Sequence, residues 1–317
     1  MKAKSFLALN LVNEAISELH KILSIDKNDE LSCVLLGKIL INKGNKIEGE
    51  RLMWKANEIN PENDEIKQFT KIMKNLMDDV LRKANSHILK GRLKLGLLLS
   101  FKALKIYPNH PEALLLRSSI YKSMGMSKEA IIDLNHAKER CKKMNLYSTN
   151  PHLENYIKNF LSEIYNDIAI KYIDSNNLKF ALEVISDAIN NNNDDFSAHL
   201  NKGDCLMKMK DIINAKEEYL LCLKIKENSI LAKSRLAHVY YKLAIFSYNS
   251  KDYLESLEML NKSIEYYKKY DFAFVLKSRT EIKLGMIQEA YNEASLAYLI
   301  NPNNQDAIEI RKYLDSI

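Results

Sequence analysis

Small residues recur along this chain at a spacing of 34 residues, and this feature restricts the fold more than any other. The segments EAIIDLNHAKER from 129, FALEVISDAINN from 180 and EAYNEASLAYLINP from 289 each carry Ala with a small residue seven positions on. Another small residue stands twelve positions earlier, and a Gly or Asn stands between. A period of this length is typical of stacked units that bury their apolar faces against their neighbours.

The same frame can be extended over most of the chain. It places repeats in two runs, 30–144 and 162–304, at 30–63, 77–110, 111–144, 162–195, 196–229, 237–270 and 271–304. Positions 8, 20 and 27 of these repeats hold only Gly, Ala, Ser or Cys. Small side chains at these positions allow close approach of two helix axes, which larger residues would force apart.

The segment GKILINKGNKIEG at 37–49 has the glycine content of a phosphate-binding loop, but the frame gives it another role. Gly37 and Gly49 fall at positions 8 and 20, where close packing needs no side chain. Gly44 falls at position 15, where the first helix ends and the residue must tolerate a left-handed conformation. The segment is therefore predicted to form a helical hairpin.

This pattern resembles the tetratricopeptide repeat family, whose repeat is a pair of antiparallel helices with small residues at positions 8, 20 and 27 and Pro near position 32. Pro61, Pro108 and Pro302 stand at position 32. The resemblance implies an all-α fold, a right-handed superhelical solenoid of antiparallel helix pairs. The segments AIIDLNHAK and HLNKGDC are also similar to the tetratricopeptide repeat protein 16 type, a group linked to cilia and axonemes.

Five segments lie outside the full repeats. Residues 1–29 are expected to be a partial repeat, because Ala15, Leu19 and Ile22 match positions 20, 24 and 27. The inserts 64–76 and 230–236 are predicted to lengthen the first helix of the repeat that follows. Residues 145–161 are expected to form a loop with Pro151 and then a helical run. Residues 305–317 are predicted to form a capping helix.

Composition argues against several other classes of protein. The chain holds only 8 Gly and 5 Pro, too few for the tight turns of a β-sandwich or barrel. Its 47 basic and 41 acidic residues give a net charge of +6 without a block of like charges, so nucleic acid is not an expected partner. No apolar run is long enough to span a membrane. We therefore expect a cytoplasmic protein, with cilium or cytoskeleton association as a further expectation from the resemblance.

No pattern typical of catalysis or metal binding occurs. The seven histidines are scattered, and neither H-E-x-x-H, G-x-S-x-G nor a Walker phosphate loop is present. Cys33, Cys141, Cys205 and Cys222 form no C-x-x-C pair and are predicted to be buried, reduced thiols. The sequence therefore predicts no catalytic residue, no metal site and no cofactor.

In the tetratricopeptide family the groove lined by the first helices is the usual binding surface. The family's carboxylate clamp for acidic chaperone tails does not fit here, because in the closest triplet only Asn201 matches its required residue. An acidic stripe at groove positions is predicted instead, suited to a basic peptide or partner helix. It consists of Glu163, Asn166, Asp167, Asp174, Asn201 and Asp204. The alternative is that these residues are solvated helix faces.

Aromatic residues gather between Tyr240 and Phe274, which raises the possibility of stacking on nucleic acid bases. Their spacing and the absence of a basic groove favour packing in the core. The resulting hypothesis is a non-enzymatic protein-interaction scaffold that binds a peptide or helix, in a ciliary or other multiprotein assembly. Two alternatives stay open: a chaperone adaptor, and the repeat region of a larger enzyme.

Overall fold

The computed structural model describes residues 2–316, which form eighteen α-helices and no strand. The predicted all-α array of helix pairs is thus confirmed. The chain divides into two compact units, an N-terminal unit of Met1–Lys143 and a C-terminal unit of Met144–Ile317.

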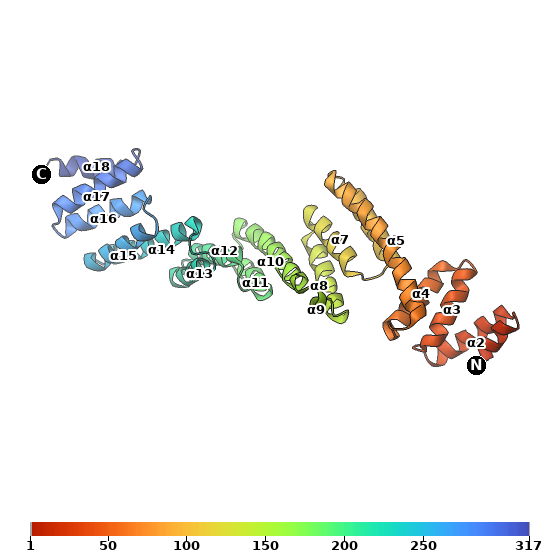
Figure 1. Cartoon of the computed structure of the whole chain (residues 1–317). Helices are drawn as coiled ribbons and strands as arrows, with labels where there is room; N and C mark the ends of the chain where they lie inside the picture. Colours follow the sequence, from red (N-terminus) through yellow and green to blue (C-terminus); the bar gives the residue numbers. More distant parts are fainter. Residues whose placement is uncertain (1, 317) are drawn as a thin grey trace. The chain divides into compact units, whose positions relative to one another are not determined.

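The N-terminal unit consists of successive helices that pack on their neighbours along the chain (Figure 1). They are α1 (Lys2–Ala8), α2 (Val12–Ile25), α3 (Glu30–Asn42), α4 (Lys46–Ile59), α5 (Asp64–Leu89), α6 (Leu93–Ile106), α7 (Pro111–Ser123) and α8 (Ser127–Lys143).

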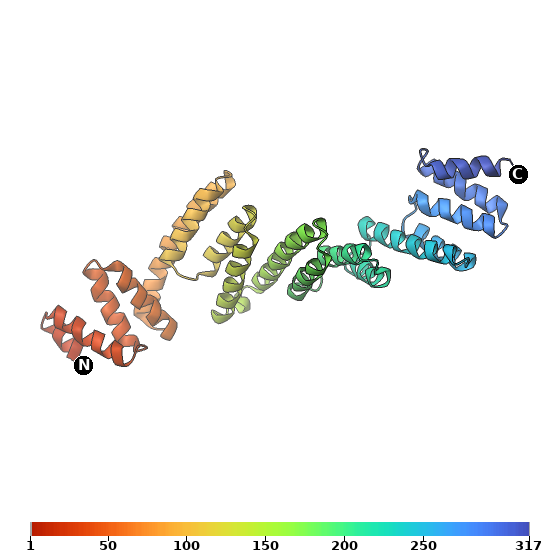
Figure 2. The same cartoon turned by 180° about the vertical axis from the view of Figure 1, so that it is seen from behind.

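The C-terminal unit continues the same arrangement, and its last helices stack side by side at the blue end of the chain in both views (Figures 1 and 2). Its helices are α9 (Leu146–Thr149), α10 (Pro151–Asp174), α11 (Leu178–Asn191), α12 (Phe196–Lys208), α13 (Ile212–Ile225), α14 (Ile230–Asn249), α15 (Tyr253–Tyr266), α16 (Asp271–Lys283), α17 (Ile287–Ile300) and α18 (Gln305–Leu314).

The turn inside each hairpin uses a left-handed residue at position 15, as predicted. The glycines at this position have φ between 70° and 89°, and non-glycine residues there also have positive φ. Positive φ lets the chain leave the first helix and reverse direction within a few residues. The residues concerned are Asn10, Gly44, Gly91, Gly125, Asn176, Lys210, Lys251 and Gly285.

Small residues bring the two helices of a hairpin into backbone contact. A Cβ atom added to Gly49 on α4 would lie 2.7 Å from the carbonyl oxygen of Gly37 on α3. Ala181, Ala188 and Ala215 are fully buried, like most residues at the predicted small positions. Close axes let these short side chains fill the core without voids.

Polar side chains start the first helices at the same point of the repeat. Asp29 accepts a hydrogen bond from the backbone N–H of Ser32, and Asn63, 34 residues later, caps α5 in the same way. Asp195, Ser229 and Asn304 cap α12, α14 and α18. Such caps satisfy N–H groups that have no partner inside the helix.

Two of the segments between the repeats of the frame are helical and continuous with the helix that follows. Residues 64–76 form the first half of α5, and residues 230–236 form the start of α14. Pro151 is the first residue of α10, so residues 151–161 extend that helix as well. At the C-terminal end, α18 covers the last hairpin with buried Ala307, Ile310 and Leu314.

Candidate protein-binding surface

The six residues of the predicted acidic stripe lie on two first helices of the C-terminal unit. Glu163, Asn166, Asp167 and Asp174 are on α10, while Asn201 and Asp204 are on α12. The three carboxylates of α10 are exposed, whereas Asn201 and Asp204 are partly buried.

Asn166 is buried, with 5% of its surface exposed. Its amide nitrogen donates to Asp195 Oδ2 at 3.2 Å, and its oxygen accepts a hydrogen bond from Asn201 Nδ2 at 3.3 Å. Ser162 also donates to Asp195. Asn166 therefore joins α10 to α12 and to the turn before α12, so little of it faces solvent.

Asp204 is bound by groups of two other helices. Arg235 of α14 donates through Nε and Nη2 at 2.7 and 3.1 Å, and the Tyr219 hydroxyl of α13 donates at 2.6 Å. The hydrogen bond to Asp204 raises the pKa of Arg235. The pKa of Tyr219 is raised mainly by burial and further by its own hydrogen bond to Asp204. The charge of Asp204 is thus largely matched inside the protein.

Similar contacts continue along the first helices of this unit. The rings of Tyr241 on α14 and Phe272 on α16 lie 6.5 Å apart, and Arg279 of α16 donates to Asp306 of α18 at 2.7 Å. Together with the Asn166–Asn201 and Asp204–Arg235 pairs, these contacts tie α10, α12, α14, α16 and α18 in order. We call the surface that carries these side chains the first-helix face.

The aromatic residues only partly follow the prediction of core packing. Phe274 is buried, and Tyr240 stacks on Tyr266 with ring centroids 5.6 Å apart. Phe246 and Phe272, however, are 73% and 50% exposed, so the prediction is wrong for these two residues. They stand on the solvent side of their helices, a distinction that spacing alone did not reveal.

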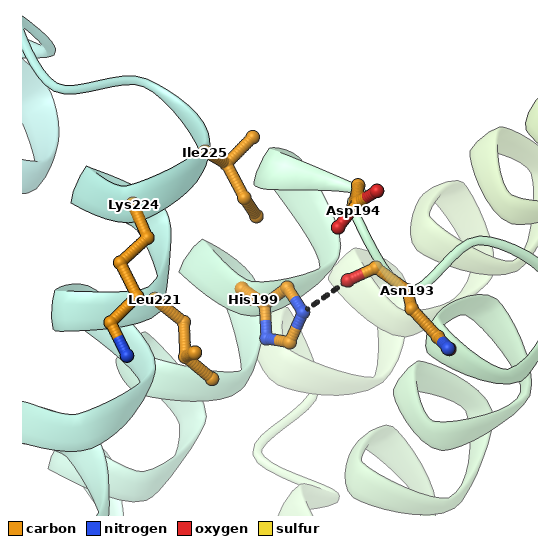
Figure 3. Close-up of a pocket in the computed structure, with 6 residues that line it drawn as sticks. All are labelled: Asn193, Asp194, His199, Leu221, Lys224 and Ile225. Atoms are coloured by element: carbon orange, nitrogen blue, oxygen red, sulfur yellow. Dashed lines mark hydrogen bonds between the residues drawn. The ribbon is translucent and has the colours of Figure 1, made fainter.

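A pocket of 470 Å³ opens between α12, α13 and the turn before α12 (Figure 3). His199 at its wall bonds through Nε2 to the Asn193 carbonyl oxygen at 2.9 Å and through Nδ1 to Glu218 Oε2 at 2.7 Å. Lys202 pairs with the other oxygen of Glu218 at 2.6 Å. The scattered histidines in the sequence gave no signal for this network.

Both ring nitrogens of His199 face acceptors, which favours the doubly protonated imidazolium. The hydrogen bond that His199 donates to Glu218 raises the pKa of His199 against the opposing effect of burial. Burial raises the pKa of Glu218, but hydrogen bonds from His199 and Lys202 outweigh it, so that pKa is lowered. Through these contacts His199 joins α12 to α13 and to the turn before α12.

All four cysteines are free and buried, as predicted. Burial raises the pKa of Cys222 to about 12. Among residues 2–316 no group of three or more His, Cys, Asp or Glu side chains is placed to hold a metal ion. None of the helices in this range combines the length and apolar character needed to span a bilayer.

The family model for the tetratricopeptide repeat matches residues 111–143 and 196–229. These two segments are thus similar to tetratricopeptide repeats. The first forms the α7–α8 hairpin, and the second forms the α12–α13 hairpin that carries Asn201, Asp204 and the His199 network. The division of the remaining chain into tetratricopeptide repeats of 34 residues is our proposal.

Several solved structures resemble the chain. The P58(IPK) TPR domain is 16% identical, with a TM-score of 0.30, covering 99% of this chain and 86% of that one. Pseudomonas aeruginosa PilF is 13% identical, with a TM-score of 0.37, covering 76% and 99%. The APC/C hetero-tetramer Cut9–Hcn1 is 14% identical, with a TM-score of 0.36, covering 96% of this chain and 59% of that one. No curated protein matches the sequence, and the similarity to the tetratricopeptide repeat protein 16 type stays a prediction.

Proposed function

We propose that this protein is a non-enzymatic scaffold that binds a peptide or helix of a partner protein on the first-helix face of its C-terminal unit. The observation that carries the proposal is the series of side-chain contacts joining α10, α12, α14, α16 and α18. These contacts hold five helices with one face outward, and binding to such a prearranged surface loses less entropy than binding to a mobile one.

The exposed carboxylates of α10 favour a basic partner segment at this end of the face. Glu163, Asp167 and Asp174 are all exposed on the same helix. Asn166 supports the site indirectly, by holding α10 against α12. The charge of Asp204 is already matched by Arg235. Lysine or arginine side chains of the partner would meet the three carboxylates, with Asn201 at their border. The proposal includes membership of a ciliary or other multiprotein assembly. Its ciliary part is based on the similarity of the segments AIIDLNHAK and HLNKGDC to the tetratricopeptide repeat protein 16 type.

Charge reversal tests this site. The variant Glu163→Lys, Asp167→Lys, Asp174→Lys is expected to weaken binding of a fluorescent Lys/Arg-rich peptide by about tenfold or more, measured by anisotropy. The matched control is Glu183→Lys, Glu217→Lys, Glu227→Lys, which changes net charge equally at exposed positions of the same unit outside α10 and α12. Equal weakening by both variants would show a general charge effect and would refute the proposed site.

A further inference from the structure

The outer face of α6 in the N-terminal unit is apolar where a soluble helix is usually polar. The buried residues of α6 are Gly96, Ser100 and Ala103, and Leu99, Leu104 and Ile106 pack against the core from the same helix. Leu95, Leu98 and Phe101 are 44%, 65% and 47% exposed. The side of α6 that faces the core thus leaves out three large apolar residues, whose exposure to solvent is unfavourable.

Three lysines share this face with the apolar residues. At 3.6 residues per turn, Lys94, Leu95, Leu98, Phe101, Lys102 and Lys105 fall within an arc of about 120°. All three lysines are exposed, and none is in an ion pair with another described residue. We call these six residues the α6 stripe.

No acidic residue balances the lysines on α6 itself. The second helices α4, α8, α11, α13, α15 and α17 all carry Glu or Asp, whereas the segment LKLGLLLSFKALKI of α6 carries none. Asp133 accepts two hydrogen bonds from Arg117 at 2.6 Å, and Glu50 and Glu58 of α4 line the same pocket as Lys105. Arg117, paired with Asp133, lies over the Phe101 ring at 4.8 Å.

The C-terminal end of the stripe borders a pocket of 370 Å³ between α4 and α6. Lys105 and Pro108 line one side, and the α4 side is lined by Ile47, Glu50, Arg51, Trp54, Lys55 and Glu58. Its apolar part, formed by Ile47, Trp54 and Pro108, can accept an apolar side chain at the end of a docked segment.

We propose that the α6 stripe is the docking site of an acidic amphipathic helix from a partner protein. The apolar side chains of that helix would cover Leu95, Leu98 and Phe101, while its carboxylates would pair with Lys94, Lys102 and Lys105. The stripe is the width of one helix contact and runs along a single helix, the geometry of helix-on-helix packing. This surface lies in the other unit from the first-helix face, so the two proposals stand or fall separately.

Binding of a defined probe tests the proposal. The probe is a fluorescein-labelled amphipathic helix of about five turns with leucines on one face and glutamates flanking them. The full chain is expected to bind this peptide, measured by anisotropy, and not the version with lysine in place of glutamate. The variant Lys94→Glu, Lys102→Glu, Lys105→Glu is expected to weaken binding by about tenfold or more. Leu98→Ser is expected to weaken it at unchanged charge.

A matched surface on α13 supplies the control. Ile213 is 67% exposed, and the variant Ile213→Ser, Lys216→Glu, Lys224→Glu places the same kinds of change on another second helix. Circular dichroism confirms that each variant folds. The proposal is overturned if the acidic peptide does not bind, or if the α13 variant weakens binding as much. It is equally overturned if the lysine variant loses binding only to phosphatidylserine vesicles, since the stripe would then be a lipid contact.

Discussion

Lys210 and Lys251 occupy a position that glycine fills in four other repeats. Their φ angles are 65° and 66°, in the left-handed region. A side chain with a Cβ is disfavoured there by roughly 1 kcal/mol, because the Cβ crowds the carbonyl oxygen. Both lysines are exposed, so contacts with the rest of the protein do not compensate for the strain.

Replacing Lys210 with glycine should therefore stabilise the protein. We expect Lys210→Gly to raise the free energy of unfolding by about 0.5–1 kcal/mol, since glycine adopts this conformation without strain. Urea denaturation followed by circular dichroism measures the change. Lys224→Gly, inside α13, should do the opposite, and a loss of stability in both variants would contradict the prediction.

Glu281 is also in an unfavourable environment, because its carboxyl group is buried without sufficient partners. It is 3% exposed, its Oε2 has no hydrogen-bond partner, and its nearest cation, Lys277, lies closer to Glu293, at 2.7 Å. Burial raises the pKa of Glu281 to about 7, against the effect of Lys277 and aided by Glu293 and Glu289. The folded state thus favours the protonated carboxyl. Its stabilising effect is complete below the ordinary pKa of a glutamate and is lost as pH rises through about 7.

Glu281→Gln should remove this pH dependence. At pH 8 the variant is expected to melt at a higher temperature than the wild type, because no charge is buried, whereas at pH 4 the two should be nearly equal. Thermal unfolding by circular dichroism at both values provides the comparison. A variant equally destabilised at both pH values would contradict the prediction. It would show that the glutamate is needed for packing and that burial of its charge does not destabilise the protein.

At the scale of helices, an asparagine pair joins the start of one helix to the end of the next. Asn301 and Asn304 donate to Asp271 at 2.7 and 2.9 Å, and Asn60 and Asn63 donate to Glu30 at 2.9 and 2.6 Å in an earlier repeat. Asn304 also caps α18. Asn304 thus links the starts of α16 and α18, and Asn301 adds the end of α17.

Asn304→Ala is expected to lower the free energy of unfolding by about 1–3 kcal/mol, since it removes a cap and leaves the buried Asp271 with one donor fewer. Asn303→Ala, at the exposed neighbouring position, is expected to change it by less than about 0.5 kcal/mol. Chemical denaturation of both variants makes the test. Equal effects would mean that the turn as a whole, and not this network, sets stability.

The small positions make a different prediction for helix packing. Gly49→Leu should cost about 1–3 kcal/mol, because its Cβ would press on the backbone of α3. Glu58→Leu, exposed on the same helix, is expected to be tolerated. Melting temperatures distinguish the two, and a tolerated leucine at 49 would show that α3 and α4 can separate without loss.

Helices could be predicted well from the sequence, because small residues and turn glycines recur at fixed positions. The surface could be predicted only in part. Asn166 sits at a groove position, but Asp195, distant in sequence, draws it inward. Phe246 and Phe272 match an aromatic pattern whose exposure depends on neighbouring helices. Burial at these sites is set by contacts between repeats, which periodicity within one repeat does not contain.

At the scale of the whole molecule, the two compact units predict separable folding. Residues 144–317 expressed alone should be helical and unfold cooperatively, because this unit has its own apolar clusters around Ile185, Tyr219 and Leu260. Circular dichroism and thermal unfolding of the fragment check this. A fragment without a cooperative transition would show that the unit depends on the residues before it.

Inside the N-terminal unit, by contrast, α5 makes separation difficult. Its first half places Ile66 and Phe69 in a core with α2, α3 and α4, and its second half places Met77, Val80 and Leu81 in a core with α6 and α7. Unfolding the whole of this helix would therefore expose apolar surface in two cores at once. Repeat arrays commonly lose their hairpins one by one. Here, because α5 belongs to both cores, we expect its neighbours to exchange their amide hydrogens as a single cooperative block.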